Sequence, residues 1–167
     1  MGVCTFGLKL MKIKILCVGK IKEKYFADAI DEYIKRLGRF CKTEIVEVAE
    51  CTAYKTDLSA SEIDRIKKSE GKDLLAKIEG FGICLDIGGK QLASEELASK
   101  IDEIKNTNSV ITFVIGGSFG MDDSVKNACK LKISFGKCTY PHQLMRVILC
   151  EQVYRAFMIN SGSAYHK

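Results

Sequence analysis

The chain has 167 residues, of which 47% are hydrophobic and 28% are charged, a balance typical of globular proteins that bury a core. No apolar run approaches the roughly 20 residues that a membrane-spanning helix needs, and the first ten residues lack the pattern of a secretory signal. The net charge is +5, and residues 1–42 hold ten Lys and Arg against four Asp and Glu. This concentration of positive charge predicts a surface that faces a polyanion.

Eight cysteines raise the question of disulfides or a metal site. They include no C-x-x-C pair, and several fall inside apolar segments. Because the sequence offers just two histidines, His142 and His166, no metal-ligand spacing appears. We therefore expect reduced, mostly buried thiols in a cytoplasmic protein without a metal.

Short apolar segments alternate with amphipathic ones along the chain, after a first stretch, residues 1–10, that we expect to be an extension outside the fold. Apolar residues recur at helical spacing from Tyr25 to Phe40, whereas residues 43–48 alternate as in a strand. The predicted strands are 12–18, 43–48, 82–89, 110–115 and 131–136. The predicted helices are 25–40, 59–79, one from Ser94, a short one from Asp122–Asp123, and one from Pro141 to about Met158.

Capping residues mark several of these helix starts. Ser59 and Glu62 have the spacing of a capping box, and Ser94 is expected to cap the helix that follows it. Pro141 suits a first helical turn, and Gly71 is expected to interrupt or loosen its helix. The alternation predicts one α/β domain, residues 11–167, with a mainly parallel sheet and helices on both faces.

Three predicted strands end in unusual, glycine-containing segments: 85–90, 115–120 and 134–143. Ligands of parallel α/β sheets bind beyond the carboxyl ends of the strands, so we expect these segments to line one crevice. Neither G-x-G-x-x-G nor a phosphate loop is present, which favours a small adenine-bearing ligand without polyphosphate. The alternative is that each glycine merely ends a strand or a helix.

From about Met11 to Lys167 the chain resembles the large-subunit ribosomal RNA (23S) pseudouridine-N3 methyltransferases of the SPOUT, or α/β-knot, class. The resemblance implies a C-terminal trefoil knot, a homodimer, S-adenosyl-L-methionine as methyl donor, and methylation of a pseudouridine in assembled ribosomes. The segments that carry it are "VGKIKEKYF", "LDIGGK" with "SEELA", "FVIGGSFG", "TYPHQLMRVILCEQVYRAF" and the terminal "YHK".

The resemblance also implies which residues contact the cofactor. Gly136 and Cys138 stand where the family is expected to have serine and methionine. Binding through backbone atoms tolerates both changes, whereas binding through a serine hydroxyl does not. The implied cofactor contacts are Leu85, Gly116, Phe135, Gly136, Lys137, Cys138, Thr139 and Tyr140.

The chain ends in Tyr165, His166 and Lys167. A terminus is by default frayed, but the resemblance implies that this tail approaches the cofactor of the partner subunit. His166 would then be the base that takes the N3 proton, and Tyr165 would stack on the target base or hydrogen-bond one of its carbonyls.

Basic residues supply candidate RNA contacts: Lys20, Lys22 and Lys24 after the first strand, and Arg146 in the last helix. Ordinary solvated charge is the alternative for the lysines, and a cofactor carboxylate is a second possible partner of Arg146. His142, in the first turn of the same helix, is expected to be neutral and hydrogen-bonded locally.

Two other functions compete with methyl transfer. One is a non-catalytic nucleotide- or RNA-binding module of the same fold. The other is a Cys–His hydrolase built on Cys138 and His142, which would need a third group to orient the histidine.

Overall fold

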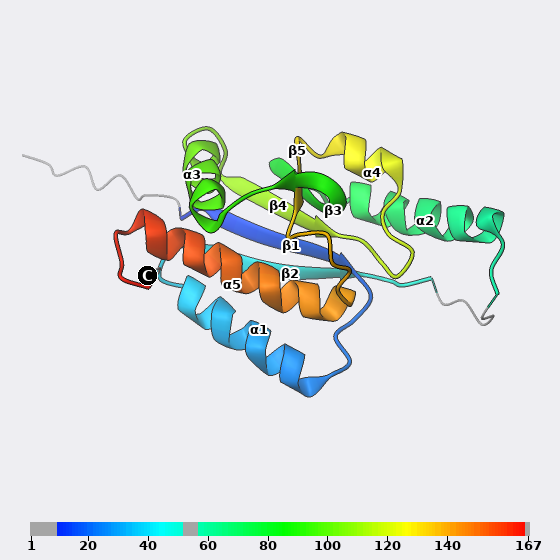
Figure 1. Cartoon of the computed structure of the whole chain (residues 1–167), viewed down its shortest axis with the longest axis horizontal. Coiled ribbons are helices and arrows are strands. Elements are labelled where there is room, and N and C mark those ends of the chain that lie inside the picture. Colours follow the sequence, from blue (N-terminus) through cyan, green and yellow to red (C-terminus); the bar gives the residue numbers. More distant parts are fainter. Residues whose placement is uncertain (1–9, 52–56, 166–167) are drawn as a thin grey trace, which may run out of the picture.

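The computed structural model describes residues 10–51 and 57–165, and this part of the chain contains a five-stranded, fully parallel sheet (Figure 1). The strand order is β2-β1-β4-β3-β5, so the two earliest strands lie at one side and the last strand lies at the other. The strands are β1 (Lys12–Val18), β2 (Lys42–Val48), β3 (Phe81–Gln91), β4 (Val110–Ile115) and β5 (Leu131–Ser134).

Helices cover both faces of the sheet, and α5 packs between α1 and α3 on one of them (Figure 1). The opposite face carries α2 and α4, which pack against each other. The helices are α1 (Lys24–Leu37), α2 (Ala60–Leu75), α3 (Ser94–Lys105), α4 (Asp123–Ala128) and α5 (His142–Asn160).

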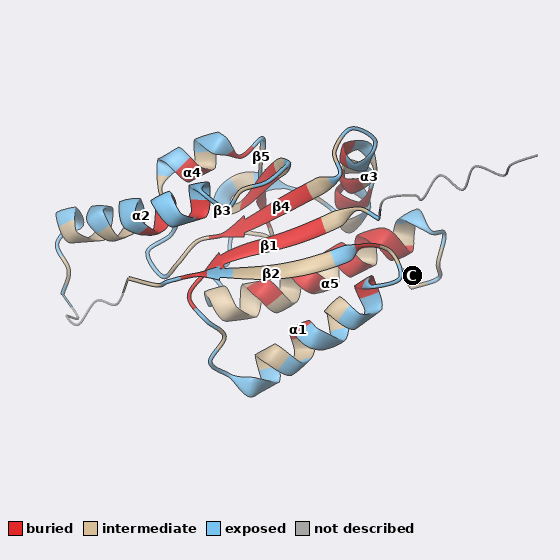
Figure 2. Cartoon of the chain, turned by 180° about the vertical axis from the view of Figure 1, so that it is seen from behind, coloured by how far each residue is buried: buried red, intermediate tan, exposed pale blue. Residues whose placement is uncertain are grey.

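β1 shows why the sheet needs a layer of helices on each of its two faces. Ile13 and Ile15 belong to the apolar cluster beneath α1, α3 and α5, whereas Leu16 and Val18 belong to the cluster beneath α2 and α4. Side chains alternate across a strand, so a central strand with apolar side chains on both of its faces must be buried on both sides. Figure 2 shows β1 and β4 buried along most of their length. The predicted α/β architecture is confirmed.

α2 begins as the sequence indicates, with Ser59 as N-cap and a complete capping box with Glu62. The expected interruption at Gly71 is wrong, because α2 runs unbroken through it. Gly71 is buried, and an added Cβ there would lie 2.9 Å from the Cβ of Asp122, the N-cap of α4. This glycine therefore serves the close packing of α2 on α4.

The start of α3 also differs from the expectation. Ala93, and not Ser94, is the N-cap, and its backbone N–H donates to Glu96 Oε2 at 2.7 Å. The Ser94 hydroxyl donates instead to Gln152 Oε1 of α5 at 2.8 Å, which ties the two helices together. The expected extension, residues 1–10, lies outside the described residues except for Leu10. Among the described helices, none is long and apolar enough to cross a membrane.

Gly80 provides a test of the packing where β3 begins. Its φ is +63°, and an added Cβ would lie 2.2 Å from the carbonyl oxygen of Val110. We expect Gly80→Ala to lower the free energy of unfolding by more than the roughly 1–2 kcal/mol of left-handed backbone alone. Gly162, with φ +70° and no heavy atom within 4 Å of such a Cβ, is the matched control. Urea denaturation measures both losses, and equal losses would contradict the steric explanation.

Candidate functional site

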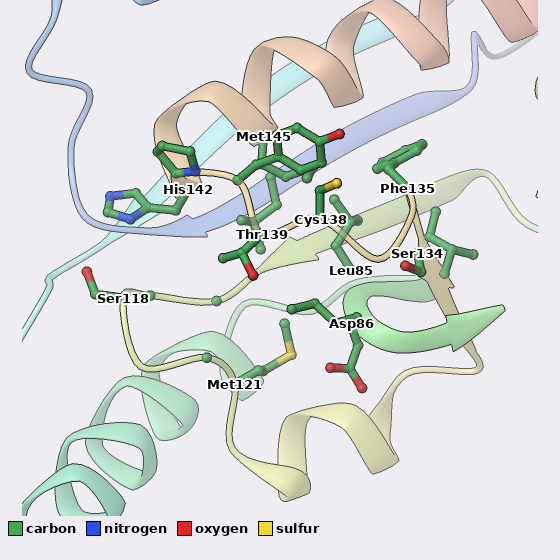
Figure 3. A pocket seen from close by; sticks show the side chains of 18 of the residues that line it. Leu85, Asp86, Ser118, Met121, Ser134, Phe135, Cys138, Thr139, His142 and Met145 are labelled. Atoms are coloured by element: carbon green, nitrogen blue, oxygen red, sulfur yellow. The ribbon is translucent and has the colours of Figure 1, made fainter. Parts of the chain in front are cut away.

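The carboxyl ends of β3, β4 and β5 meet at one edge of the sheet. Cys84 of β3 pairs with Val114 of β4, and Leu85 pairs with Ile133 of β5. A cavity of about 840 Å³ lies at this edge, between the middle part of β3, the loops that follow β4 and β5, and the first turn of α5 (Figure 3). Its size is typical of a small-molecule site.

The cavity brings together most of the residues that the sequence assigned to a cofactor. Lys137 is the exception, because it is exposed and is not among the lining residues. The predicted residues that line the cavity are Leu85, Gly116, Phe135, Gly136, Cys138, Thr139 and Tyr140.

The wall formed by β3 has an unexpected shape. β3 does not stop at residue 89: its register shifts so that both Leu85 and Lys90 lie opposite Ile133 of β5. The intervening segment bulges, and Asp86 and Ile87 line the cavity. The sequence placed segment 85–90 at the crevice but did not single out these two residues, because a bulge depends on pairing with β5 and leaves no separate periodicity signal.

Three further side chains line the cavity: Ser118, which lies in the predicted segment 115–120, and Met121 and Met145, which lie outside the predicted segments. The glycines around Ser118 were a usable signal, because they fold the segment back on itself. Gly120 N–H donates to the Gly117 carbonyl at 3.0 Å, and a Cβ on Gly116 would lie 2.9 Å from the Gly120 carbonyl oxygen.

The chemistry of the lining fits an adenosine-like ligand without phosphate groups. Leu85, Ile115, Phe135 and Met145 give apolar surface, and backbone groups of the glycine turn lie beside them. No Lys or Arg is among the lining residues, so phosphate groups would find no cationic side chain there. Asp86 is the acidic residue of the lining, and its carboxylate lies 3.2 Å from Lys126 Nζ. Among the described residues, no cluster of His, Cys, Asp or Glu could hold a metal ion.

Comparison with known proteins identifies the family. A family model described as "Predicted SPOUT methyltransferase" matches residues 11–166. The chain belongs to the SPOUT methyltransferase family. This membership places its fold in the α/β-knot class, as the resemblance implied.

Curated relatives of this SPOUT methyltransferase carry the name "Ribosomal RNA large subunit methyltransferase H". The protein from Lactobacillus delbrueckii subsp. bulgaricus is 53% identical over 160 residues, which covers 94% of this chain and all of the relative. The protein from Streptococcus equi subsp. zooepidemicus is 52% identical over 165 residues, with the same coverage of both chains.

Two solved structures share the fold. A methylase family protein from Haemophilus influenzae Rd KW20 aligns with a TM-score of 0.53 at 12% identity, over 93% of this chain and 70% of that chain. A tRNA methyltransferase from Aquifex aeolicus aligns with a TM-score of 0.51 at 14% identity, over 87% of this chain and 69% of that chain.

Arg146 of this SPOUT methyltransferase does not lie where an RNA phosphate could reach it. Its side chain is fully buried and forms an ion pair with Glu47 Oε1 at 2.8 Å. It also donates to the carbonyl oxygens of Val18 and Gly19, at 2.7 and 2.8 Å. The predicted phosphate contact is therefore wrong: Arg146 fixes α5 to the carboxyl ends of β1 and β2.

The three candidate lysines are exposed, and they lie beside the cavity rather than in it. Lys22 N–H donates to Gln143 Oε1 of α5 at 3.0 Å, so the loop that carries Lys20 and Lys22 is attached next to His142. Lys24 begins α1 and pairs with Asp28 at 2.6 Å.

Tyr165 lies at the other end of α5. Its ring is 5.1 Å from that of Tyr154, edge-on, and Arg155 lies over it at 4.9 Å. The residues that it contacts, Glu151, Tyr154 and Arg155, lie about 14–20 Å along α5 from His142, which lines the cavity. His166 and Lys167 are outside the described residues.

The buried ion pair of Arg146 makes a direct stability prediction. Arg146→Met removes the cation that pairs with Glu47 and the donor of two backbone carbonyls, so we expect the free energy of unfolding to fall by about 3–5 kcal/mol. Arg36→Met removes an ion pair of the same 2.8 Å length to Glu32, but both side chains are largely exposed. The free energy of unfolding should fall far less in Arg36→Met than in Arg146→Met. Comparable losses in denaturant titrations would show that burial does not set the strength of the Arg146 contacts.

Proposed function

We propose that this SPOUT methyltransferase uses S-adenosyl-L-methionine to methylate N3 of a pseudouridine in large-subunit (23S) ribosomal RNA, on assembled ribosomes in the cytoplasm. The observation that carries the proposal is the cavity, in which Leu85, Gly116 and Thr139 come together from three separate segments. The name of relatives more than 50% identical to this chain supports ribosomal RNA as the substrate.

The cavity can hold the cofactor with side chains and backbone groups already in place. Leu85 and Phe135 would contact the adenine, and the turn at Gly116 together with the loop 136–140 would bind its polar edges. When bound, S-adenosyl-L-methionine supplies a methyl group that is activated by a sulfonium sulfur. The chain's remaining tasks are to hold the target base in line and to accept its N3 proton.

The C-terminal tail would complete the site of a partner subunit. Tyr165 packs beside Tyr154 on the distal part of α5, whereas the cavity adjoins the first turn of that helix. Tyr165 held there does not line its own cavity, and neither do the residues of α5 that it contacts. We therefore infer a homodimer in which Tyr165 and His166 of the partner subunit close over the base, with His166 as the general base.

RNA would approach from the side of the basic loop. Lys20, Lys22 and Lys24 are exposed, and Lys22 is attached to the helix that borders the cavity. These positive charges would neutralise phosphates of the RNA and make binding sensitive to salt.

The hydrolase hypothesis finds less support. Cys138 and His142 both line the cavity, but among the described residues no hydrogen bond joins them and none orients the histidine. The non-catalytic module differs from the proposal in turnover, which an activity measurement decides.

The proposed reaction has a direct test. Labelled S-adenosyl-L-methionine is incubated with the protein and with ribosomes that lack the modification, or with naked RNA, and the labelled nucleoside is identified. We expect label in N3-methylpseudouridine from ribosomes, and much less from naked RNA. Binding of the cofactor without any transfer would instead indicate the non-catalytic module.

The shared site predicts complementation between two defective subunits. Cys138→Trp fills the cavity, and His166→Ala removes the proposed base; each homodimer should be inactive. Heterodimers isolated with two different affinity tags should recover about half the wild-type rate, since one of their two composite sites is intact. Heterodimers as inactive as their parents would refute the placement of the tail in the partner's site.

A further inference from the structure

His142 is a half-buried imidazole that lines the cavity and has no role in the cofactor contacts proposed above. The sequence favoured a histidine hydrogen-bonded to its neighbours, but among residues 10–51 and 57–165 no hydrogen bond or ion pair engages its ring. Arg146, one turn further along α5, has three such contacts. The ring nitrogens of His142 are thus available to hydrogen-bond a ligand.

The ring lies where the cavity meets the basic loop. Figure 3 shows His142 and Ser118 at one end of the cavity and Phe135 at the other. The Ser118 hydroxyl donates to Glu50 Oε1 at 3.0 Å, so this end has its own polar groups. A ligand with its adenine beside Phe135 would leave the end at His142 for the second substrate.

Burial, together with nearby positive charge, keeps His142 uncharged. Burial lowers the pKa of His142 below its usual value, and the positive charges of Arg146 and Lys22 lower it further, against a smaller opposite effect of Glu50. At neutral pH the ring is therefore a neutral imidazole, with one nitrogen that donates a hydrogen bond and one that accepts.

We propose that His142 contacts the target base and donates a ring N–H to one of the two carbonyl oxygens that flank its N3. The proposal rests on the proposed function, because it assigns a residue to the same reaction. As N3 gains the methyl group, its proton passes to the base proposed above, His166 of the partner subunit. Negative charge that develops as the proton leaves spreads from N3 onto those oxygens, where an N–H donor stabilises it.

A neutral donor suits this task, because an imidazolium would be costly in a half-buried site next to Arg146. A neutral histidine that polarises a carbonyl is an established way to stabilise such charge. The structure supplies the required features in one place: a cavity wall, an unengaged ring and an adjoining basic loop that leads the RNA to it.

Two substitutions distinguish a hydrogen bond donated by residue 142 from the mere filling of space by its side chain. His142→Ala removes the donor, and His142→Asn keeps an N–H at similar reach. In single turnovers with saturating cofactor and ribosomes, we expect His142→Ala to be slowed about 10- to 100-fold and His142→Asn to recover a large part of that loss. The affinity for S-adenosyl-L-methionine, measured by calorimetry, and the thermal midpoint should stay near wild type. Lys105→Ala, an exposed change on α3, serves as the control.

Each outcome has a defined meaning. A wild-type rate for His142→Ala, or equal slowing of both variants, would overturn the assignment while leaving the proposed function intact. A wild-type protein that binds the cofactor but never methylates would overturn the function itself. If wild type loses activity towards acidic pH and His142→Asn does not, the ring accepts a proton instead, and the donor role is refuted.

Discussion

The parallel pairing of β4 with β3, and of β3 with β5, is the constraint on which the cavity depends. Parallel strands present their carboxyl ends at the same edge, so the bulge of β3 after residue 85 lies beside the loops that follow residues 115 and 134. The sheet therefore assembles a site from segments far apart in the sequence. Apolar burial on both faces of β1 and β4 holds that pairing in register.

A second constraint fixes the side of the cavity that is formed by the first turn of α5. Arg146 is buried against Glu47 and two carbonyls at the end of β1, which fixes the start of α5 relative to the sheet. Gln143, in the same turn, holds the backbone of Lys22. The basic loop and the cavity wall are thus parts of one connected structure, so a change in either is transmitted to the other. Arg146, which the sequence suggested as an RNA contact, in fact holds the end of β1 from which the loop of Lys20 and Lys22 begins.

The sequence was sufficient for most of the architecture, because its signals are local. Apolar runs and caps such as Ser59 located strands and helices to within a few residues, and the rule about carboxyl ends brought Leu85, Gly116 and Thr139 to one place. Errors arose where a residue serves a distant partner. From the sequence alone, Gly71 suggested a break in its helix, but in the structure it allows α4 to pack closely against α2. Arg146 suggested an exposed RNA contact, but in the structure it is buried against Glu47.

The site itself was predictable only in part, for the same reason. Backbone turns with glycine are visible in the sequence, whereas the bulge that turns Asp86 and Ile87 into the cavity exists only once β3 pairs with β5. The sequence favoured a neutral His142, but it also favoured a local hydrogen bond to the ring, which the described residues do not supply. The fold and family are shown by comparison.

The most direct test of the account is a crystal structure of the protein with S-adenosyl-L-methionine. It should show the adenosine between Leu85, Gly116 and Thr139, with the methyl group directed towards the end of the cavity at His142. A cofactor bound elsewhere, or a cavity that stays empty at saturating cofactor, would contradict the central claim that these converging loops form the methyl-donor site.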